Sequence, residues 1–298
     1  MMKVAVSFFG LHQLSGGDHR IVLDAARMAD ELGIDHIVAA DHVAVGPGTE
    51  DYPFPGQYGY PMNEPWPEPL ISLAAMAAVT KQVRLATSVL LAPLRPAALL
   101  AKQAATLDVL SNGRLDLGVG AGWLRAEFEA SGVPYDGRNR RMDDVVRACQ
   151  ALWSGAPVSF SSPTITFNDI WSLPLPVQPG GVPIWFGGGA NAATARRIAE
   201  LGVGWLPFDP TPEHLSRGIE LISAAFQEAG REPSTLQVQA LLRPIRRDNG
   251  RLDLEAMLET IPQLESLGVT SVGVQASAFI DRADGLEPFL GRVAAARA

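Results

Sequence analysis

The chain has little of what marks an extracellular, nucleic-acid-binding or membrane-spanning protein. Cys149 is its only cysteine, so no disulfide can form within the chain, which favours a reducing compartment such as the cytoplasm. The net charge is −8 and no long basic run occurs, which argues against nucleic acid because phosphate neutralisation needs clustered Lys and Arg. No apolar run approaches the ~18 residues of a membrane span, and the N-terminal MMKVAVSFFG does not resemble a signal peptide. We therefore expect a cytoplasmic protein whose partner is a small-molecule substrate.

Patterns typical of metal sites and of serine hydrolases are also missing. The five histidines are scattered and none is spaced as in H-x-x-x-H, so we expect no metal site. No G-x-S-x-G occurs, which leaves a serine hydrolase without support. The composition, 47% hydrophobic and 19% charged, is that of a folded protein, and no linker is visible. We expect one domain over residues 1–298.

Short apolar segments alternate with segments of helical period. The expected strands are residues 3–9, 34–40, 83–91, 115–119, 183–187, 204–207, 236–241 and 271–274. The expected helices are residues 18–32, 69–80, 96–110, 138–153, 192–201, 212–229 and 254–267. Eight strands with helices between them predict an α/β fold, the (β/α)8 TIM barrel.

A recurring unit supports this fold. A helix ends in Leu-Gly-Ile or Leu-Gly-Val and an apolar strand follows, at residues 29–42, 199–209 and 265–275. We expect Gly33, Gly202 and Gly268 to adopt positive φ where their helices end.

Two insertions interrupt the alternation. Residues 43–67, after the second strand, are rich in Pro, Gly and aromatic residues, which are Tyr52, Phe54, Tyr58, Tyr60 and Trp66. Such a long segment at the active end is expected to form a lid or a pocket wall, although the rings could simply pack the loop down. Residues 156–182, before the fifth strand, are expected to form a short hairpin followed by a proline-rich tail.

Two glycine-rich segments follow strands. Gly120-Ala121-Gly122 follows the fourth strand, and Gly187-Gly188-Gly189-Ala190-Asn191 follows the fifth and leads into a helix with Asn191 as its N-cap. Free N–H groups and the helix dipole make the second segment a candidate phosphate site. The alternative is that its glycines only form a tight turn.

Asp41 and His42 close the second strand, at the catalytic end of the expected barrel. His42 could exchange a proton or hydrogen bond with a ligand, or it could bond loop backbone and shape the pocket. Asp41 could contact the same ligand or cap the loop that follows. We favour ligand contact for Asp41.

These segments together resemble the bacterial-luciferase-like flavin monooxygenase superfamily and, within it, oxidoreductases that depend on the deazaflavin coenzyme F420. The resemblance covers most of the chain. It rests on the order and spacing of Ala40-Asp41-His42, RLATSVLLAP, GVGAGW, LPLPVQ and PIWFGGG.

The resemblance implies a barrel that binds F420 at its C-terminal face and transfers hydride to or from a small, partly apolar substrate. His42 would lie beside the reactive ring as the catalytic residue. A bulge in the third strand would place the Ser88–Val89 peptide, often cis in the family, behind the ring. The assigned cofactor-binding residues are Phe8, Asp41, Ser88, Val89, Ala121, Gly122, Gly187, Gly188, Gly189 and Asn191. The family is usually dimeric, so we expect a homodimer.

Alternatives of the same fold remain open. Trp123 stands where sugar-phosphate dehydrogenases of the family have a catalytic glutamate, which argues against that reaction. Glu127, one helical turn further on, is expected to be a capping or salt-bridge residue. An FMN-dependent monooxygenase would grip one phosphate with Arg or Lys near the fourth and fifth strands. F420 needs an open basic groove for its polyglutamate tail, which Arg138, Arg140 and Arg141 would suit, although such a run is solvated by default. A non-catalytic cofactor carrier is the third possibility.

Overall fold

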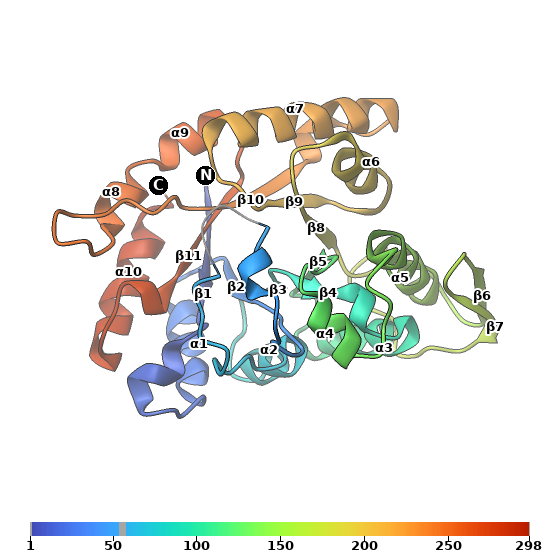
Figure 1. Cartoon of the computed structure of the whole chain (residues 1–298), viewed down its shortest axis with the longest axis horizontal. Coiled ribbons are helices and arrows are strands. Elements are labelled where there is room, and N and C mark those ends of the chain that lie inside the picture. The colour runs from blue at the N-terminus through green and yellow to red at the C-terminus, as the bar shows by residue number, and fades with distance from the viewer. Residues whose placement is uncertain (1, 54–57, 298) are drawn as a thin grey trace.

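Parallel strands form the centre of the molecule, which a computed structural model describes at residues 2–53 and 58–297 (Figure 1). The barrel strands are β1 Lys3–Ser7, β2 His36–Ala39, β3 Arg84–Thr87, β4 Leu90–Leu91, β5 Leu115–Gly120, β8 Ile184–Gly188, β9 Gly204–Pro207, β10 Gln237–Leu241 and β11 Ser271–Gln275. Neighbours pair in the order β3-β2-β1-β11-β10-β9-β8-β5, and β3 pairs with β5 to close the ring. The predicted (β/α)8 barrel is confirmed.

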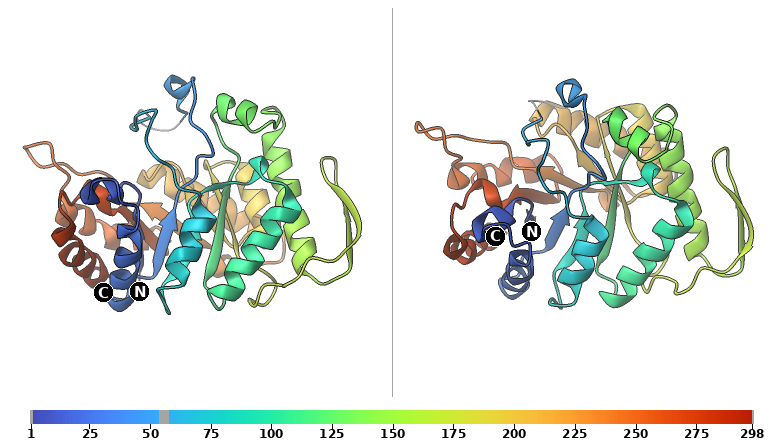
Figure 2. Two further views of the ribbon diagram at one scale, coloured as in Figure 1. Left: turned by 90° about the horizontal axis from the view of Figure 1, so that it is seen from below. Right: turned by 60° about the horizontal axis from the view of Figure 1, so that its bottom comes forward.

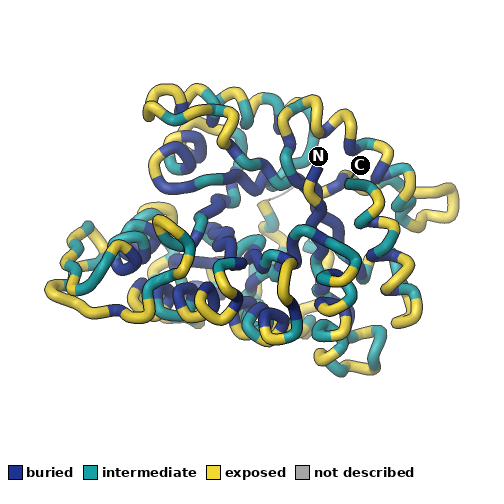
Figure 3. The backbone as a smooth tube through the Cα atoms, turned by 180° about the vertical axis from the view of Figure 1, so that it is seen from behind, coloured by how far each residue is buried: buried dark blue, intermediate teal, exposed yellow. Residues whose placement is uncertain are grey.

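Helices surround the barrel and bury its strands. They are α1 Ile21–Glu31, α2 Pro69–Ala77, α3 Ala97–Leu110, α4 Arg125–Ala130, α5 Arg138–Trp153, α6 Ala192–Leu201, α7 Pro212–Glu228, α8 Leu254–Leu258, α9 Ile261–Ser266 and α10 Leu286–Ala295. Figure 3 shows buried strands inside a layer of helices whose outer faces are exposed. All six residues of β5 are buried, as expected for a parallel strand covered on both faces.

The third expected strand is divided. β3 and β4 are separated by Ser88 and Val89, whose peptide bond is cis, as the resemblance implied. The backbone N–H of Ser88 still donates to the carbonyl of Ala39 on β2 (2.8 Å), so the interruption stays attached to the barrel.

Three other expectations need correction. Gly33 and Gly268 have positive φ (78° and 96°), but Gly202 is extended at φ −124°. A Cβ on Gly202 would lie 2.9 Å from the Phe186 ring, so close packing accounts for this glycine. The expected helix 254–267 is two helices, α8 and α9, with Pro262 in the first turn of the second. Helices α4 and α10 were not predicted.

The insertion before β8 forms the expected hairpin. Strands β6 Val158–Ser161 and β7 Thr166–Ile170 pair antiparallel, and they project at the edge of the molecule in Figure 1. The tail that follows returns to the barrel, where Gln178 donates to Asp108 (2.7 Å) and accepts from Arg84 (3.1 Å). No helix in the described parts of the chain has the length and apolar character needed to cross a membrane.

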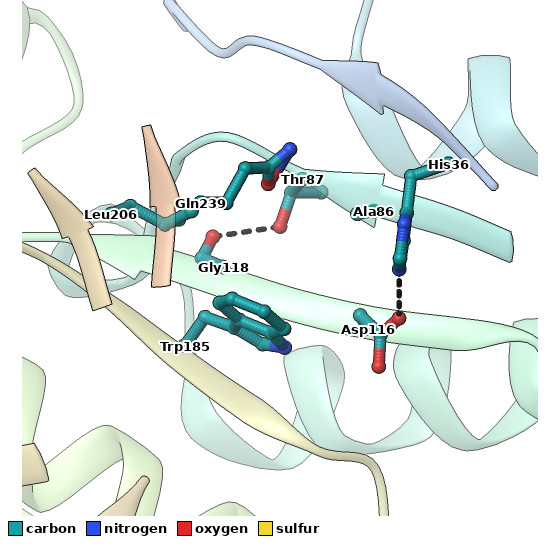
Figure 4. A pocket seen from close by; sticks show the side chains of 8 residues that line it. All are labelled: His36, Ala86, Thr87, Asp116, Gly118, Trp185, Leu206 and Gln239. Atoms are coloured by element: carbon teal, nitrogen blue, oxygen red, sulfur yellow. Dashed lines mark hydrogen bonds and ion pairs between the residues drawn. The ribbon is translucent and has the colours of Figure 1, made fainter. Parts of the chain in front are cut away.

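A polar cluster fills the barrel near the N-terminal ends of its strands (Figure 4). Asp116 on β5 lies 3.3 Å from His36 on β2 and accepts from Arg84 on β3 (2.6 and 2.8 Å). Burial alone would raise the pKa of Asp116, but the hydrogen bonds from His36 and Arg84 outweigh it and hold this pKa below the usual range. The adjoining cavity, of about 10 Å³, has room for no more than a single water and is too small for an organic cofactor.

Candidate functional site

The C-terminal end of the barrel carries most of the predicted site residues. Figure 2 shows the segment after β2 and the short helix α4 rising from the same end of the molecule. Among the described residues of the segment after β2, the 3-10 turn Thr49–Asp51 is the one stretch of regular structure. Ligands of such barrels bind at this end, among the loops that follow the strands.

His42 is fixed from one side by a buried carboxylate. Its Nδ1 lies 3.0 Å from Oε2 of Glu127 on α4. The other oxygen of Glu127 accepts from the backbone N–H groups of Val43 (2.5 Å) and Ala44 (3.3 Å). Glu127 is completely buried and the His42 side chain is 10% exposed. The sequence suggested capping or a salt bridge for Glu127, and the structure shows that its partner is the predicted catalytic histidine.

Aromatic rings surround the other side of His42. Trp66, Tyr58 and Trp123 meet its ring edge-on, with centroids at 4.7, 6.0 and 6.1 Å. Tyr60 contacts Trp66 at 5.3 Å, and Tyr52 contacts Trp123 at 5.2 Å. The insertion aromatics therefore gather around His42 as one cluster, joined by Phe9, which stacks on Trp66 at 4.1 Å. Phe54 lies outside the described residues.

The aromatic cluster gives His42 an apolar, neutral environment. Burial raises the pKa of Tyr52, Tyr58 and Tyr60, so these phenols stay protonated at neutral pH. The hydroxyl of Tyr60 donates to Gln275 at the end of β11 (3.1 Å), which ties the insertion to the barrel. Such a wall suits a substrate with an apolar part.

Asp41 directs its carboxylate away from His42. It accepts from the Arg95 guanidinium (2.6 and 3.2 Å) and from the backbone N–H of Leu91 on β4 (2.9 Å). Burial opposes the charge of Arg95, yet the bonds and charges of Asp41 and Glu68 raise the pKa of Arg95 overall. These partners lie outside the loop that Asp41 was alternatively expected to cap, and its side chain is only 1% exposed. A contact between Asp41 and a cofactor stays a prediction.

Val89 packs between the two glycine-rich segments. An added Cβ on Gly120 would lie 2.6 Å from Cγ2 of Val89, and one on Gly187 would lie 2.9 Å from its Cγ1. Both distances are well below the 3.5–4.0 Å of normal carbon contacts. Gly120 and Gly187 therefore lack side chains because the isopropyl group of Val89 occupies the space where a Cβ would lie. Ser88, the residue before it, is half-buried.

The start of α6 partly fits the predicted phosphate site. A Cβ on Gly188 would lie 2.9 Å from the Thr194 hydroxyl, whereas Gly189 has only the Asn191 amide nearby, at 3.6 Å. Asn191 caps the helix as predicted, accepting from the Thr194 N–H at 3.0 Å. The N–H of Ala190 donates to Nε2 of His214 (3.1 Å). Packing thus explains Gly187 and Gly188, whereas a Cβ on Gly189 would make only an ordinary contact with the Asn191 amide.

The loop after β5 is held by an arginine and a tyrosine. Arg138 donates to the carbonyl of Gly122 (3.0 Å) and lies 3.9 Å over the Tyr135 ring. The hydroxyl of Tyr135 donates to the carbonyl of Trp123 (3.0 Å). Gly122 needs its positive φ of 76°, and Ala121 beside it is half-buried. Arg138 is therefore part of the loop structure as well as a source of positive charge.

Phe8 is buried in the hydrophobic core, so it is its neighbour Phe9 that joins the aromatic cluster. In the described ranges, no group of three or more His, Cys, Asp or Glu side chains could hold a metal ion.

A family model and individual relatives are similar to this chain. The sequence model of the luciferase-like monooxygenase family matches residues 2–263. An uncharacterised protein of Mycobacterium tuberculosis is 30% identical over 255 residues, which are 83% of this chain and 84% of the relative. The FMNH2-dependent dimethylsulfone monooxygenase of Pseudomonas putida is 36% identical over 131 residues, which are 42% of this chain and 36% of that enzyme.

Solved structures of both cofactor classes share the fold. A monooxygenase from Streptomyces bottropensis superposes with a TM-score of 0.78 at 24% identity, covering 99% of this chain and 97% of that one. An F420-dependent secondary alcohol dehydrogenase, in complex with an F420–acetone adduct, gives 0.78 at 19% identity, covering 100% and 99%. The resemblance predicted from the sequence is confirmed.

Proposed function

Because this chain belongs to the luciferase-like monooxygenase family, we propose that it is an oxidoreductase that uses coenzyme F420 to transfer hydride to or from a small, partly apolar substrate. The observation that carries this proposal is His42, anchored by Glu127 at Nδ1 and enclosed by aromatic rings at the C-terminal end of β2. The remaining ring nitrogen, Nε2, is the polar atom that can face a substrate.

The residues present fit a flavin-like cofactor. Val89 offers an apolar surface between β5 and β8, and Gly189 leaves room for a ligand at the start of α6. Free N–H groups there would favour an anionic group of the cofactor. The bound cofactor supplies the hydride chemistry, while the protein binds it, excludes water and presents His42 to the substrate.

The charge distribution favours F420 over FMN. Arg140 on α5 and Arg196 on α6 are exposed, and neither forms an ion pair with any described residue. By contrast, Arg197 is paired with Asp143. Two exposed guanidinium groups on α5 and α6 suit an extended anionic tail better than a single terminal phosphate.

Fluorescence titration of the ligand-free protein with F420 and, separately, with FMN tests the proposal. We expect F420 to bind with a Kd in the micromolar range or below, about −8 kcal/mol, and FMN to bind more weakly. Exposed charge pairs contribute roughly 0.2–1 kcal/mol each. The Arg140→Ala, Arg196→Ala double variant should therefore lose about two- to thirtyfold in F420 affinity, with a smaller loss for FMN. Arg147→Ala is the matched control, since Arg147 is paired with Glu200 (2.8 Å). Stronger binding of FMN would overturn the assignment.

FMN-dependent oxygenation is the second candidate function. The similarity to the dimethylsulfone monooxygenase favours this function. That enzyme is 36% identical to this chain over its matched segment, compared with 30% for the mycobacterial relative. An enzyme of this kind would consume O2 with reduced FMN, whereas the F420 enzyme would not. Turnover measured with an oxygen electrode separates the two. Bound cofactor that no added compound reoxidises would indicate a non-catalytic carrier instead.

We also propose a homodimer formed through α2 and α3. Both helices are mostly apolar, and they expose Ile71 (69%), Leu99 (50%) and Leu110 (67%) on their outer faces. Burying these side chains against a second copy would remove them from water. Sedimentation velocity should give a dimer for the wild type and a monomer for Ile71→Glu, Leu99→Glu. Trp171→Ser, which changes an equally exposed apolar residue just after β7, should remain dimeric.

A further inference from the structure

We infer that Glu127 is a positioning residue that fixes the tautomer of His42, with the proton on Nδ1 and the lone pair of neutral imidazole on Nε2. This inference rests on the proposed function for its meaning in catalysis, but its central claim, the position of a proton, does not require any cofactor.

Hydrogen-bond donors converge on the carboxylate of Glu127. The N–H groups of Val43 and Ala44 can only donate, and both point at Oε1. Oε2 is 3.0 Å from Nδ1 of His42, a normal hydrogen-bond distance. An ionised carboxylate has only acceptor atoms, so Nδ1 must supply the proton of this bond. In neutral imidazole Nε2 then carries the lone pair.

Glu127 and His42 are isolated from other hydrogen-bonding groups of the described residues. The Glu127 side chain is fully buried. Among the described residues, its carboxylate has the three consecutive donors of residues 42–44 and no other hydrogen-bond partner. Within the same part of the chain, no hydrogen bond reaches Nε2 of His42, and the neighbouring rings meet the imidazole edge-on. The protein thus determines one ring nitrogen and leaves the other for a ligand.

Glu127 also joins two separate segments of the chain at the C-terminal end of the barrel. Glu127 holds both the side chain of His42 and the two peptide N–H groups that follow it, so the ring and its backbone are fixed together. Its helix α4 begins five residues after β5 ends at Gly120. The carboxylate therefore connects the end of β2 with the segment that follows β5. A lone pair on Nε2 makes His42 an acceptor for a substrate hydroxyl or another proton-bearing atom.

The Glu127→Gln variant keeps the shape of the side chain and replaces one acceptor oxygen with a donor NH2 group. Its amide oxygen can still accept from Val43 and Ala44, while its NH2 group would face Nδ1 and donate to it. We expect His42 to carry its proton on Nδ1 in the wild type and on Nε2 in this variant. Long-range ¹H–¹⁵N correlation spectra of protein labelled with ¹⁵N-histidine, recorded at increasing pH until they stop changing, report which nitrogen is protonated in the neutral ring. The signal of His42 is assigned by its loss in His42→Gln.

Glu129→Gln is the matched control, because Glu129 lies on the same helix and is exposed. This control should leave the tautomer and the turnover unchanged. With F420 and a substrate found by screening, Glu127→Gln should lower kcat by about 10²- to 10⁴-fold and leave the Kd for F420 within about twofold of the wild type. A residue that only supported the fold would not exchange the proton between the two nitrogens.

The outcomes separate this inference from the proposed function. Protonation of Nε2 in the wild type, or an unchanged tautomer in Glu127→Gln, overturns the positioning role even if F420 binds and turns over. The expected tautomers together with no F420 binding would leave the positioning role intact and refute the cofactor assignment.

Discussion

The contact between Val89 and Gly120 leads to a quantitative prediction about how the site is built. In Gly120→Ala the new methyl group would lie 2.6 Å from Cγ2 of Val89, about 1 Å inside normal contact. Gly120 has no positive φ, so the cost is steric. Overpacking of this kind typically lowers the free energy of unfolding by about 1–3 kcal/mol.

Removing the opposing methyl groups should relieve the clash. In Val89→Ala both Cγ atoms are lost, at a cost of roughly 2 kcal/mol for the cavity they leave. The nearest remaining atom to a methyl on Gly120 is then Cβ of Val89, at 3.4 Å, which is ordinary contact. The double variant should therefore be more stable than the sum of the single effects predicts, by about 1–2 kcal/mol.

Urea unfolding of the four proteins, followed by tryptophan fluorescence, measures this coupling. Gly291→Ala is the control, because Gly291 lies within α10 with open space at its Cβ position. Alanine there should stabilise the protein by about 0.5–1 kcal/mol. Additivity of Gly120→Ala and Val89→Ala within about 0.5 kcal/mol would refute the close packing of Val89 against β5.

Three further predictions concern charge and reactivity. Asp116→Asn should lower the free energy of unfolding by about 2 kcal/mol at neutral pH, because Arg84 loses its carboxylate partner. Since the folded-state pKa of Asp116 is depressed, the wild type keeps this stabilisation above about pH 4 and loses it as the pH falls further; urea midpoints of both proteins should therefore converge in acid. Burial raises the pKa of the Cys149 thiol, so iodoacetamide should label it only after unfolding, and fast labelling of the native protein would contradict this. Arg138→Ala removes the hydrogen bond to the carbonyl of Gly122. The variant should bind F420 with a higher Kd while its melting temperature stays close to that of the wild type.

The barrel was predictable because its signals are local. Apolar runs, helix periodicity and glycines at helix ends depend only on neighbouring residues. The expected strand ranges therefore agree well with the observed ones. Gly33 and Gly268 have the predicted positive φ for this reason. Gly202 differs because the ring of Phe186, on another element, determines which side chain fits there. A pattern along the chain does not reveal that type of contact.

The short helix α4 shows the same limit within the site. Residues 125–130 are too few for a helical period to be recognised, so this helix was not predicted. The sequence suggested a salt bridge or cap for Glu127, but the choice of partner depends on the fold, since His42 is 85 positions away. The sequence signal for this residue is an acid placed between Ala126 and Phe128, shortly after the glycine-rich segment 120–122.

Asp41 and His42 illustrate why neighbours in sequence cannot be assigned together. Successive residues at a strand end point in different directions. The carboxylate of Asp41 meets Arg95 and β4, whereas the imidazole of His42 meets Glu127 and the aromatic rings. Each side chain is held by a charged partner from a different helix or loop. His42 thus keeps one polar atom, Nε2, without a hydrogen-bond partner among the described residues, whereas both oxygens of Asp41 accept hydrogen bonds.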